Sequence, residues 1–345
     1  MYPYRVFISY SREDREIAKR VVGHLEAMGM HPFWDDRLVP GPPFSQQILD
    51  GIAFSHAFIS VLTLTSARGA WVHQEIGYAV GVGVPVLLLA VDELPEGIVE
   101  GFQALVTTPD LANLEDRLTP ELIEQAVSQA REKSYAAFQC AEFPEQRTAL
   151  LADYARKVLQ LRQHGRIRQR AALTSFCIPD EPPSHPVWAE REGGIERTGY
   201  SRRLQREERR ALEEHARAEG CDLILDPTIP LADRGAGARK SRLKTLLEFL
   251  RDKSDDKARV VFQPIAGRGN MLIVGDWFVA ESQVVRPALG YFQTICSRHA
   301  PTVLRHLDEF DEEFERLLEQ FVPEGQSSRL KAIEELERVI KGIVV

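Results

Sequence analysis

The chain of 345 residues is 44% hydrophobic and 27% charged, which is the balance of a folded globular protein and excludes a disordered one. Its formal net charge of −8 excludes a general attraction to nucleic acid or anionic lipid, so such binding would require a local basic patch. The length indicates two domains, each large enough to bury a core.

Cysteine usage and the lack of long apolar segments indicate a reduced, cytoplasmic protein that is not bound to a membrane. The first residues lack the basic segment and apolar run of a signal peptide, and no apolar run approaches the ~20 residues of a membrane helix. The cysteines form no CxxC pair, so the sequence predicts neither a zinc site nor a disulfide framework. They are Cys140, Cys177, Cys221 and Cys296.

The first third of the chain alternates between strand-like and helix-like segments. Strands are predicted at 5–10, 31–34, 57–64 and 84–91, helices at 13–28 and 44–54, and a loop rich in Asp, Pro and Gly at 35–43. The last two strands are apolar without alternation, which is typical of a parallel sheet covered by helices on both faces. Ligands of such sheets bind beyond the carboxyl ends of the strands. Tyr10, the loop after residue 34 and the turn before Trp71 lie at such ends, so we expect the functional site there.

The remainder of the chain predicts a second α/β domain with a helical tail. Residues 115–170 read as helical, so we expect a helical linker at 134–177, followed by a Pro-rich break at 178–186. The second domain is expected at 178–345. Its strands are predicted at 222–225, 259–263 and 271–280, and its helices at 201–219, 239–251, 302–321 and 327–343.

One helical segment, AWVHQEIGYAV at 70–80, carries a tryptophan and a carboxylate four residues apart. Trp71 and Glu75 therefore lie on one face of the helix. Spacing alone leaves two interpretations open, because a glutamate in the first turns of a helix is commonly a solvated charge and Trp71 can simply cover the core. The sequence contains no Ser–His–Asp set and no metal cluster with useful spacing.

Four segments in this order resemble a TIR (Toll/interleukin-1 receptor) domain over residues 3–133. They are VFISYSRED at 6–14, FWDDRLVPG at 33–41, AFISVLTLTSARGAWVHQEI at 57–76 and VPVLLLAV at 84–91. The resemblance is greatest to NAD-cleaving TIR domains, which include SARM-like animal enzymes and bacterial defence proteins, and it implies a flavodoxin-like parallel sheet. One departure is the segment from Asp35 to Gly41, which is shorter than in the animal enzyme.

The resemblance implies an NAD+ glycohydrolase in which Glu75 is the catalytic residue and NAD+ is the substrate, with neither cofactor nor metal. The substrate-side residues that it implies are Phe7, Ser9, Tyr10, Arg12, Asp35, Leu38 and Trp71. It further implies assembly of TIR domains through a loop that contains Arg37, Leu38, Pro40 and Gly41. The second domain would then control assembly in response to an unknown ligand or partner, in defence against phage.

The chemistry of NAD+ explains why a single carboxylate is enough. Nicotinamide leaves as a neutral base from a bond that is already cationic, so no general acid has to protonate it, whereas ordinary glycosidases need two carboxylates. One carboxylate could hold the ribose hydroxyls and favour the positive charge that develops at the anomeric carbon. Water or the adenine ring can then attack, so a linear and a cyclic product both remain open.

Two other readings of the first domain compete with this hypothesis. A non-enzymatic TIR adaptor would only assemble through the 37–41 loop, but an adaptor does not need an aromatic ring and a carboxylate together. A phosphoacceptor receiver domain is disfavoured because Ser9 and Tyr10, rather than acidic residues, end the first strand.

The second half offers weaker candidates. Six polar or small residues could line a cleft at a strand end: Gly275, Asp276, Glu281, Ser282, Arg298 and His299. The segment at 269–314 resembles the closing half of phospholipase-D-like domains. The HxKxxxxD signature of that family is absent, so phosphodiester hydrolysis is unsupported. A basic cluster of Arg239, Lys240, Arg242 and Lys244 could bind a nucleotide signal or simply form a solvated helix face.

Overall fold

The protein is described by a computed structural model that covers residues 3–34, 44–64, 66, 70–92, 102, 104–130, 138–172, 174–179, 195–227, 235–264, 269–286, 291–323 and 325–343. The chain forms two compact units. Unit 1 comprises Met1–Phe138 with the short segments Gln160–Arg162 and Arg298–Pro301, and unit 2 comprises Gln139–Leu159, Gln163–Ser297 and Thr302–Val345. None of the described helices is both long enough and apolar enough to cross a membrane.

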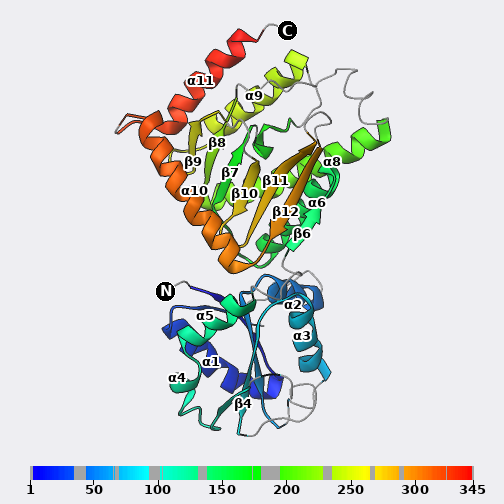
Figure 1. Cartoon of the computed structure of the whole chain (residues 1–345), viewed down its shortest axis with the longest axis vertical. Helices are drawn as coiled ribbons and strands as arrows, with labels where there is room; N and C mark the ends of the chain where they lie inside the picture. The colour runs from blue at the N-terminus through cyan, green and yellow to red at the C-terminus, as the bar shows by residue number, and fades with distance from the viewer. Residues whose placement is uncertain are drawn as a thin grey trace. The chain divides into compact units, whose positions relative to one another are not determined.

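Unit 1 is built on a five-stranded parallel sheet with the order β2-β1-β3-β4-β5, which is the flavodoxin-like order that we predicted. Its strands are β1 (Arg5–Ser9), β2 (His31–Phe33), β3 (Ala57–Leu62), β4 (Val86–Val91) and β5 (Ala104–Thr107). Its helices are α1 (Arg15–Ala27), α2 (Phe44–Ala53), α3 (Ala70–Gly81), α4 (Leu114–Arg117) and α5 (Pro120–Gln129), with a short 3₁₀ helix, η1 (Arg12–Asp14), before α1. Figure 1 shows these elements in blue to cyan-green.

Helices cover both faces of this sheet. On one face, Val6 and Ile8 pack in a single core cluster with Val21 of α1 and Ile123 of α5. On the other face, Phe7 approaches α2 so closely that a Cβ on Gly51 would lie 3.1 Å from the Phe7 ring. Because successive strand residues point to opposite faces, the even positions of β1 belong to the first face and the odd positions to the second.

Unit 2 contains a seven-stranded mixed sheet with the order β6-β12-β11-β10-β7-β8-β9. Its strands are β6 (Phe138–Ala141), β7 (Ile167–Ala171), β8 (Cys221–Leu225), β9 (Ala258–Phe262), β10 (Asn270–Val274), β11 (Phe278–Arg286) and β12 (Tyr291–Ser297). Its helices are α6 (Pro144–Gln160), α8 (Ile195–Glu219), α9 (Gly235–Arg251), α10 (Ala300–Phe321) and α11 (Ser328–Gly342), with a 3₁₀ helix, η7 (Ser175–Cys177). The long helix α10, orange in Figure 1, packs on one face of the sheet through Phe310 and Phe314. The opposite face meets α6, where Tyr154 contacts Phe278 edge to face.

Two predictions about the elements of unit 2 are wrong. The expected helix over 115–170 is interrupted by strand β6 at Phe138–Ala141 and ends in strand β7 at Ile167–Ala171, which joins the parallel and antiparallel parts of the sheet. The expected single strand at 271–280 is a hairpin, because the chain turns at Gly275, whose φ of +50° lies in the left-handed region that favours glycine.

Candidate active site

Glu75 lies on the inward face of α3. The buried residues of this helix are Val72, Glu75, Ile76 and Ala79, a spacing that places the carboxyl side chain among three apolar ones. Only 6% of Glu75 is exposed. It is therefore not the solvated helix charge that its position in the sequence also allowed.

Ser9 and Trp71 flank the carboxyl group of Glu75. The pKa of Glu75 is raised from 4.5 to about 7, because the effect of burial outweighs the lowering effects of the Ser9 hydroxyl and the Trp71 indole. The indole N–H can only donate, so its approach to Glu75 favours the carboxylate form. The Ser9 contact is looser, because Ser9 Oγ is buried without a partner at standard hydrogen-bond geometry among the described residues. Near neutral pH, Glu75 is therefore partly protonated and partly ionised.

Trp71 contacts Glu75 and is also open to solvent. Although its indole reaches Glu75, 45% of the residue is exposed. An exposed indole one turn from a buried carboxyl group offers a flat apolar surface beside an ionisable oxygen, which suits a ligand with an aromatic ring next to a polar or cationic group.

A buried aspartate supports the same edge of the sheet. Asp14, 7% exposed, accepts hydrogen bonds from Thr63 Oγ1 at 3.2 and 3.1 Å. The Thr63 N–H in turn donates to Ser66 Oγ at 2.7 Å. This chain of contacts holds the turn that leads from β3 towards α3. Asp14 is not predicted as a site residue from the sequence, although S-x-x-D at 11–14 is a helix-start pattern. Its bond to Thr63, 49 residues away, has no local signal.

The family comparison decides what this unit is. The family model of the TIR domain matches residues 6–127. Residues 6–127 are a TIR domain. A comparison with curated proteins finds no match.

Solved structures that resemble the chain do so weakly. The TIR domains of the activated Roq1 resistosome, which recognises the pathogen effector XopQ, are 18% identical, and the match covers 38% of this chain and 85% of theirs with a TM-score of 0.26. The metazoan TIR-STING receptor from C. gigas, bound to 2',3'-cGAMP, is 18% identical. That match covers 52% of this chain and 60% of the receptor, with a TM-score of 0.30. The archaeal chromatin protein TrmBL2 is 12% identical. That match covers 57% of this chain and 58% of TrmBL2, with a TM-score of 0.32. Values this low support no argument about function.

The TIR domain does not bring every expected residue to Glu75. Phe7 is buried in the core, with its ring stacked on Phe58 at 5.7 Å and 5.9 Å from Phe33. Tyr10 packs on the α1 face of the sheet, 6.0 Å from the Trp34 ring. Arg12 begins η1 as an exposed residue. Of the expected set, Ser9 and Trp71 are the two that the described structure places against Glu75.

The remaining expected residues of the TIR domain lie outside the described part of the chain. These are the substrate-side Asp35 and Leu38, together with Arg37, Pro40 and Gly41 of the expected assembly loop. Among the described residues, no group of three or more His, Cys, Asp or Glu side chains is arranged to hold a metal ion.

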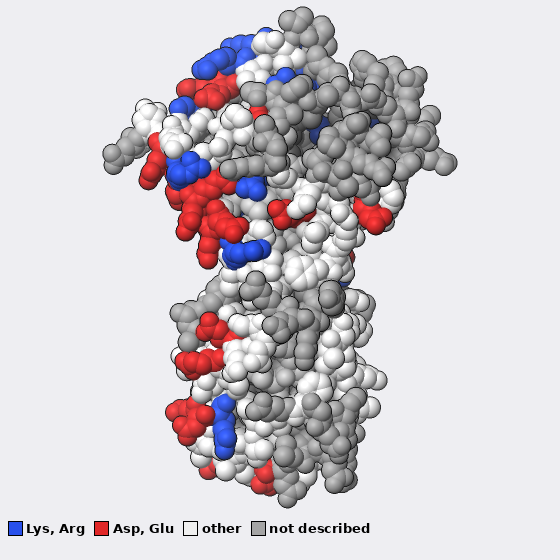
Figure 2. All heavy atoms as spheres, in the orientation of Figure 1, with Lys and Arg blue, Asp and Glu red and all other residues white. Residues whose placement is uncertain are grey.

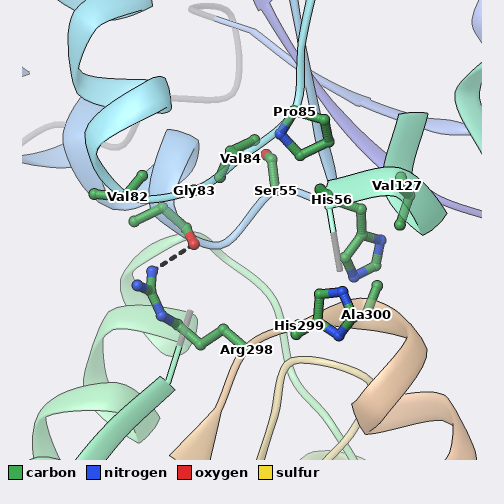
Figure 3. Close-up of a pocket in the computed structure, with 12 residues that line it drawn as sticks. Ser55, His56, Val82, Gly83, Val84, Pro85, Val127, Arg298, His299 and Ala300 are labelled. Atoms are coloured by element: carbon green, nitrogen blue, oxygen red, sulfur yellow. Dashed lines mark hydrogen bonds between the residues drawn. The ribbon is translucent and has the colours of Figure 1, made fainter. Parts of the chain in front are cut away.

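A small cavity lies at the opposite edge of the TIR sheet. It is lined by residues just before β3 and β4, such as Ser55 and Val84, and by Arg298 and His299 of the returning segment of unit 1 (Figure 3). Arg298 Nη1 donates to the carbonyl of Ala53. The cavity measures about 30 Å³, room for a single water molecule, and is too small for a ribose. It lies at the amino ends of the strands, away from the edge where Ser9 meets Glu75.

The candidates of the second half do not form one cleft. Glu281 and Ser282 are neighbours on β11 and so point to opposite faces, and Ser282 Oγ is buried against Thr294 Oγ1 at 2.7 Å. Arg298 and His299 belong to unit 1. In the basic cluster, Arg239 donates to the carbonyl of Pro227 and Lys240 to that of Ile343, so these two side chains hold α9 in place.

Proposed function

We propose that this protein is an NAD+ glycohydrolase with Glu75 as its catalytic residue. The observation that carries the proposal is the buried Glu75 carboxyl group, bordered by the Ser9 hydroxyl and the indole of the half-exposed Trp71 at the carboxyl edge of the TIR sheet. This is the edge at which α/β sheets of this order bind ligands. A purely structural role would be served at lower cost by an apolar residue, because burying a carboxyl group is unfavourable.

The proposed reaction breaks the bond between the nicotinamide nitrogen and the anomeric carbon of the ribose. The bonding electrons leave with nicotinamide, which becomes neutral, and the ribose becomes oxocarbenium-like. The Glu75 carboxylate stabilises this positive charge in a site of low polarity, where electrostatic stabilisation is strongest. A water oxygen then bonds to the anomeric carbon and releases a proton, which yields ADP-ribose; attack by the adenine ring would give the cyclic product instead.

The neighbours of Glu75 have distinct roles in this proposal. The Trp71 ring stacks on the nicotinamide or the adenine while its N–H orients the Glu75 carboxylate. The Ser9 hydroxyl, which lacks a partner of standard geometry among the described residues, donates to a ribose hydroxyl or to Glu75. Because Trp71 and Ser9 approach the carboxyl group from α3 and β1, the substrate would be held between two elements of the fold.

Activity is proposed to depend on assembly. TIR domains would associate through the 37–41 loop and complete the substrate pocket between neighbours, and the C-terminal unit would set the assembly state in response to a ligand or partner. The biological setting that we propose is the cytoplasm of a cell under attack by phage, in which loss of NAD+ stops growth.

The decisive experiment follows nicotinamide release from NAD+ by the purified full-length protein at high concentration or with a crowding agent. Glu75→Gln keeps the shape and removes the charge, and we expect it to lower kcat/KM by about a hundredfold or more, the size of losing one electrostatic transition-state contact. Glu121→Gln is the matched control, because Glu121 is exposed on α5, and should leave the rate unchanged.

Two results would reject the proposal. Equal turnover by wild type and Glu75→Gln would remove Glu75 from the mechanism. No turnover by assembled wild-type protein would instead indicate a TIR adaptor that acts by association alone.

A further inference from the structure

A cavity of about 370 Å³ lies within unit 2, between its sheet and α10. The sheet contributes Arg170 of β7, Met271 of β10 and Glu281 of β11. Met271 pairs in register with Arg170 on one side and with Glu281 on the other, so the three side chains point to the same face. That face is covered by α10, because Met271 and Phe310 share one core cluster. The volume is at the small end of the range for ligand pockets, ~300–1,000 Å³.

The opposite wall of the cavity is a single face of α10. His306, Glu309, Glu313 and Arg316 follow one another at intervals of three and four residues, the spacing that brings helix side chains into one row. Phe310 is fully buried below them. The cavity therefore has an apolar floor of Met271 and Phe310 and charged walls.

Ion pairs hold α10 against the sheet, but they neutralise only some of the charged side chains that line the cavity. Arg168 binds Asp311 through two hydrogen bonds of 2.6 and 2.8 Å, and Arg170 Nη1 donates to Glu313 at 2.8 Å. Arg170 Nε is buried with no hydrogen-bond acceptor among the described residues, whereas other atoms of this side chain line the cavity.

The charges left over have opposite signs at opposite ends of the cavity. Neither Glu281 nor Arg316 has an ion-pair partner among the residues that the structure describes. Arg170 and Arg316 are at the β7 end, because Glu313 one turn earlier binds Arg170, whereas Glu281 lies two strands away, roughly 10 Å across the sheet. On the helix, Glu309 adds a second carboxylate at the rim, 61% exposed and 3.6 Å from His306 Nδ1.

We propose that this cavity binds a small zwitterion of amino-acid or dipeptide size. Its ammonium group would lie between Glu281 and Glu309, and its carboxylate would accept from Arg316 and from the part of the Arg170 guanidinium that lines the cavity, in charge-assisted hydrogen bonds. Its carbon chain would rest on Met271 and Phe310. Exposed acidic residues of α10 gather on the surface around this site (Figure 2) and favour the orientation with the ammonium group towards them.

The site is independent of NAD+ cleavage, so its test is direct binding to the full-length protein by isothermal titration calorimetry. The probes are L-glutamine for the amino acid and alanyl-alanine for the dipeptide, each also with an acetylated amine and with an amidated carboxylate. We expect at least one free zwitterion to bind, and each blocked form to bind at least about tenfold more weakly, because each loses one charge-assisted contact. The comparison of the two probes identifies the size of the ligand.

Variants locate the binding site. Glu281→Gln and Arg316→Gln should each weaken binding by at least about tenfold, whereas Glu312→Gln, on the exposed side of α10 and outside the cavity, should not change it. Arg316 is itself exposed, so its variant tests the site without risk to folding. The proposal is overturned if neither probe binds at roughly 10 mM, if either blocked form binds as well as the free one, or if all three variants behave alike.

Discussion

At the scale of single residues, the proposed mechanism requires Glu75 to satisfy two opposed conditions. Burial favours its protonated form and raises its pKa to about 7, yet stabilising a cationic ribose requires the carboxylate. The contacts with Trp71 and Ser9 favour the carboxylate and limit the rise of the pKa. The balance places the ionisation of Glu75 near neutral pH, where small changes in its surroundings alter the fraction of the carboxylate form.

This ionisation predicts the pH dependence of the proposed activity. Because the pKa is raised, Glu75 is mostly protonated below about pH 7 and ionised above it, so kcat/KM for NAD+ should rise with pH and level off above about pH 8, with an apparent pKa near 7. The measurement is initial nicotinamide release between about pH 5.5 and pH 8.5 at constant ionic strength. Glu121→Gln should follow the same curve. A flat profile over this range would contradict the assignment of Glu75 as the group that must ionise.

Single residues also mark the limit of what the sequence predicts. The meeting of Trp71 with Glu75 follows from helical spacing alone. The burial of Glu75 does not, because it depends on α3 packing against β3 and β4, and the same holds for the bond between Asp14 and Thr63, which are 49 residues apart. Tyr10 was expected beside Glu75 because it ends β1, but it follows Ser9 directly, and strand alternation directs it to the other face.

At the scale of elements, the predicted strands of unit 1 were confirmed, whereas β7 was predicted to be helical. The segment RIRQR looks like the end of a charged helix, yet its burial alternates as in a half-buried strand. Arg168 and Arg170 can face α10 because Asp311 and Glu313, both 143 residues later, neutralise them. Partners at that distance in the sequence leave no local pattern, so a helix was the natural interpretation.

The turn of the β10–β11 hairpin packs closely against the backbone at Gly165. A Cβ on Gly165 would lie 2.6 Å from the backbone nitrogen of Gly275 and 2.7 Å from its Cα. Because backbone atoms cannot move aside as a flexible side chain can, Gly165→Ala should lower the free energy of unfolding of unit 2 by about 1–3 kcal/mol. The measurement is hydrogen exchange of the β7 and β10 amides, which reports the opening of this unit in a chain with two units.

Gly342→Ala is the matched control for this prediction. Gly342 ends α11 in the same unit, and a Cβ there meets nothing within 4 Å, so the change should be neutral or stabilising by up to about 1 kcal/mol. Equal exchange in the two variants would show that the contact between Gly165 and Gly275 is not tightly packed.

At the scale of the whole molecule, the chain joins a parallel TIR sheet to a larger mixed sheet. The class of both parts was predictable, because long apolar runs indicate buried strands and helical periodicity indicates the covering helices. The strand order of unit 2 was not, since β6, β7 and β12 were not recognised and β10 with β11 was read as a single strand. The net charge of the chain is −8. Part of this negative charge lies on α10, whose acidic residues are close to the cavity of unit 2.

The dependence of activity on assembly is the remaining prediction at this scale. If neighbouring TIR domains complete each substrate pocket, nicotinamide release per mole of protein should rise with protein concentration, because the fraction assembled rises by mass action. Leu38→Asp should lower activity and assembly together by at least about tenfold, since a desolvated charge at an interface weakens association. Gly41→Pro should act in the same direction.

Leu330→Asp is the matched control, because Leu330 is 50% exposed on α11. Activity should be measured beside sedimentation velocity on the same samples. Turnover per mole that is constant across concentrations would show that each TIR domain carries a complete pocket of its own, and a Gly41→Pro protein that assembles normally but is inactive would contradict the link between assembly and activity.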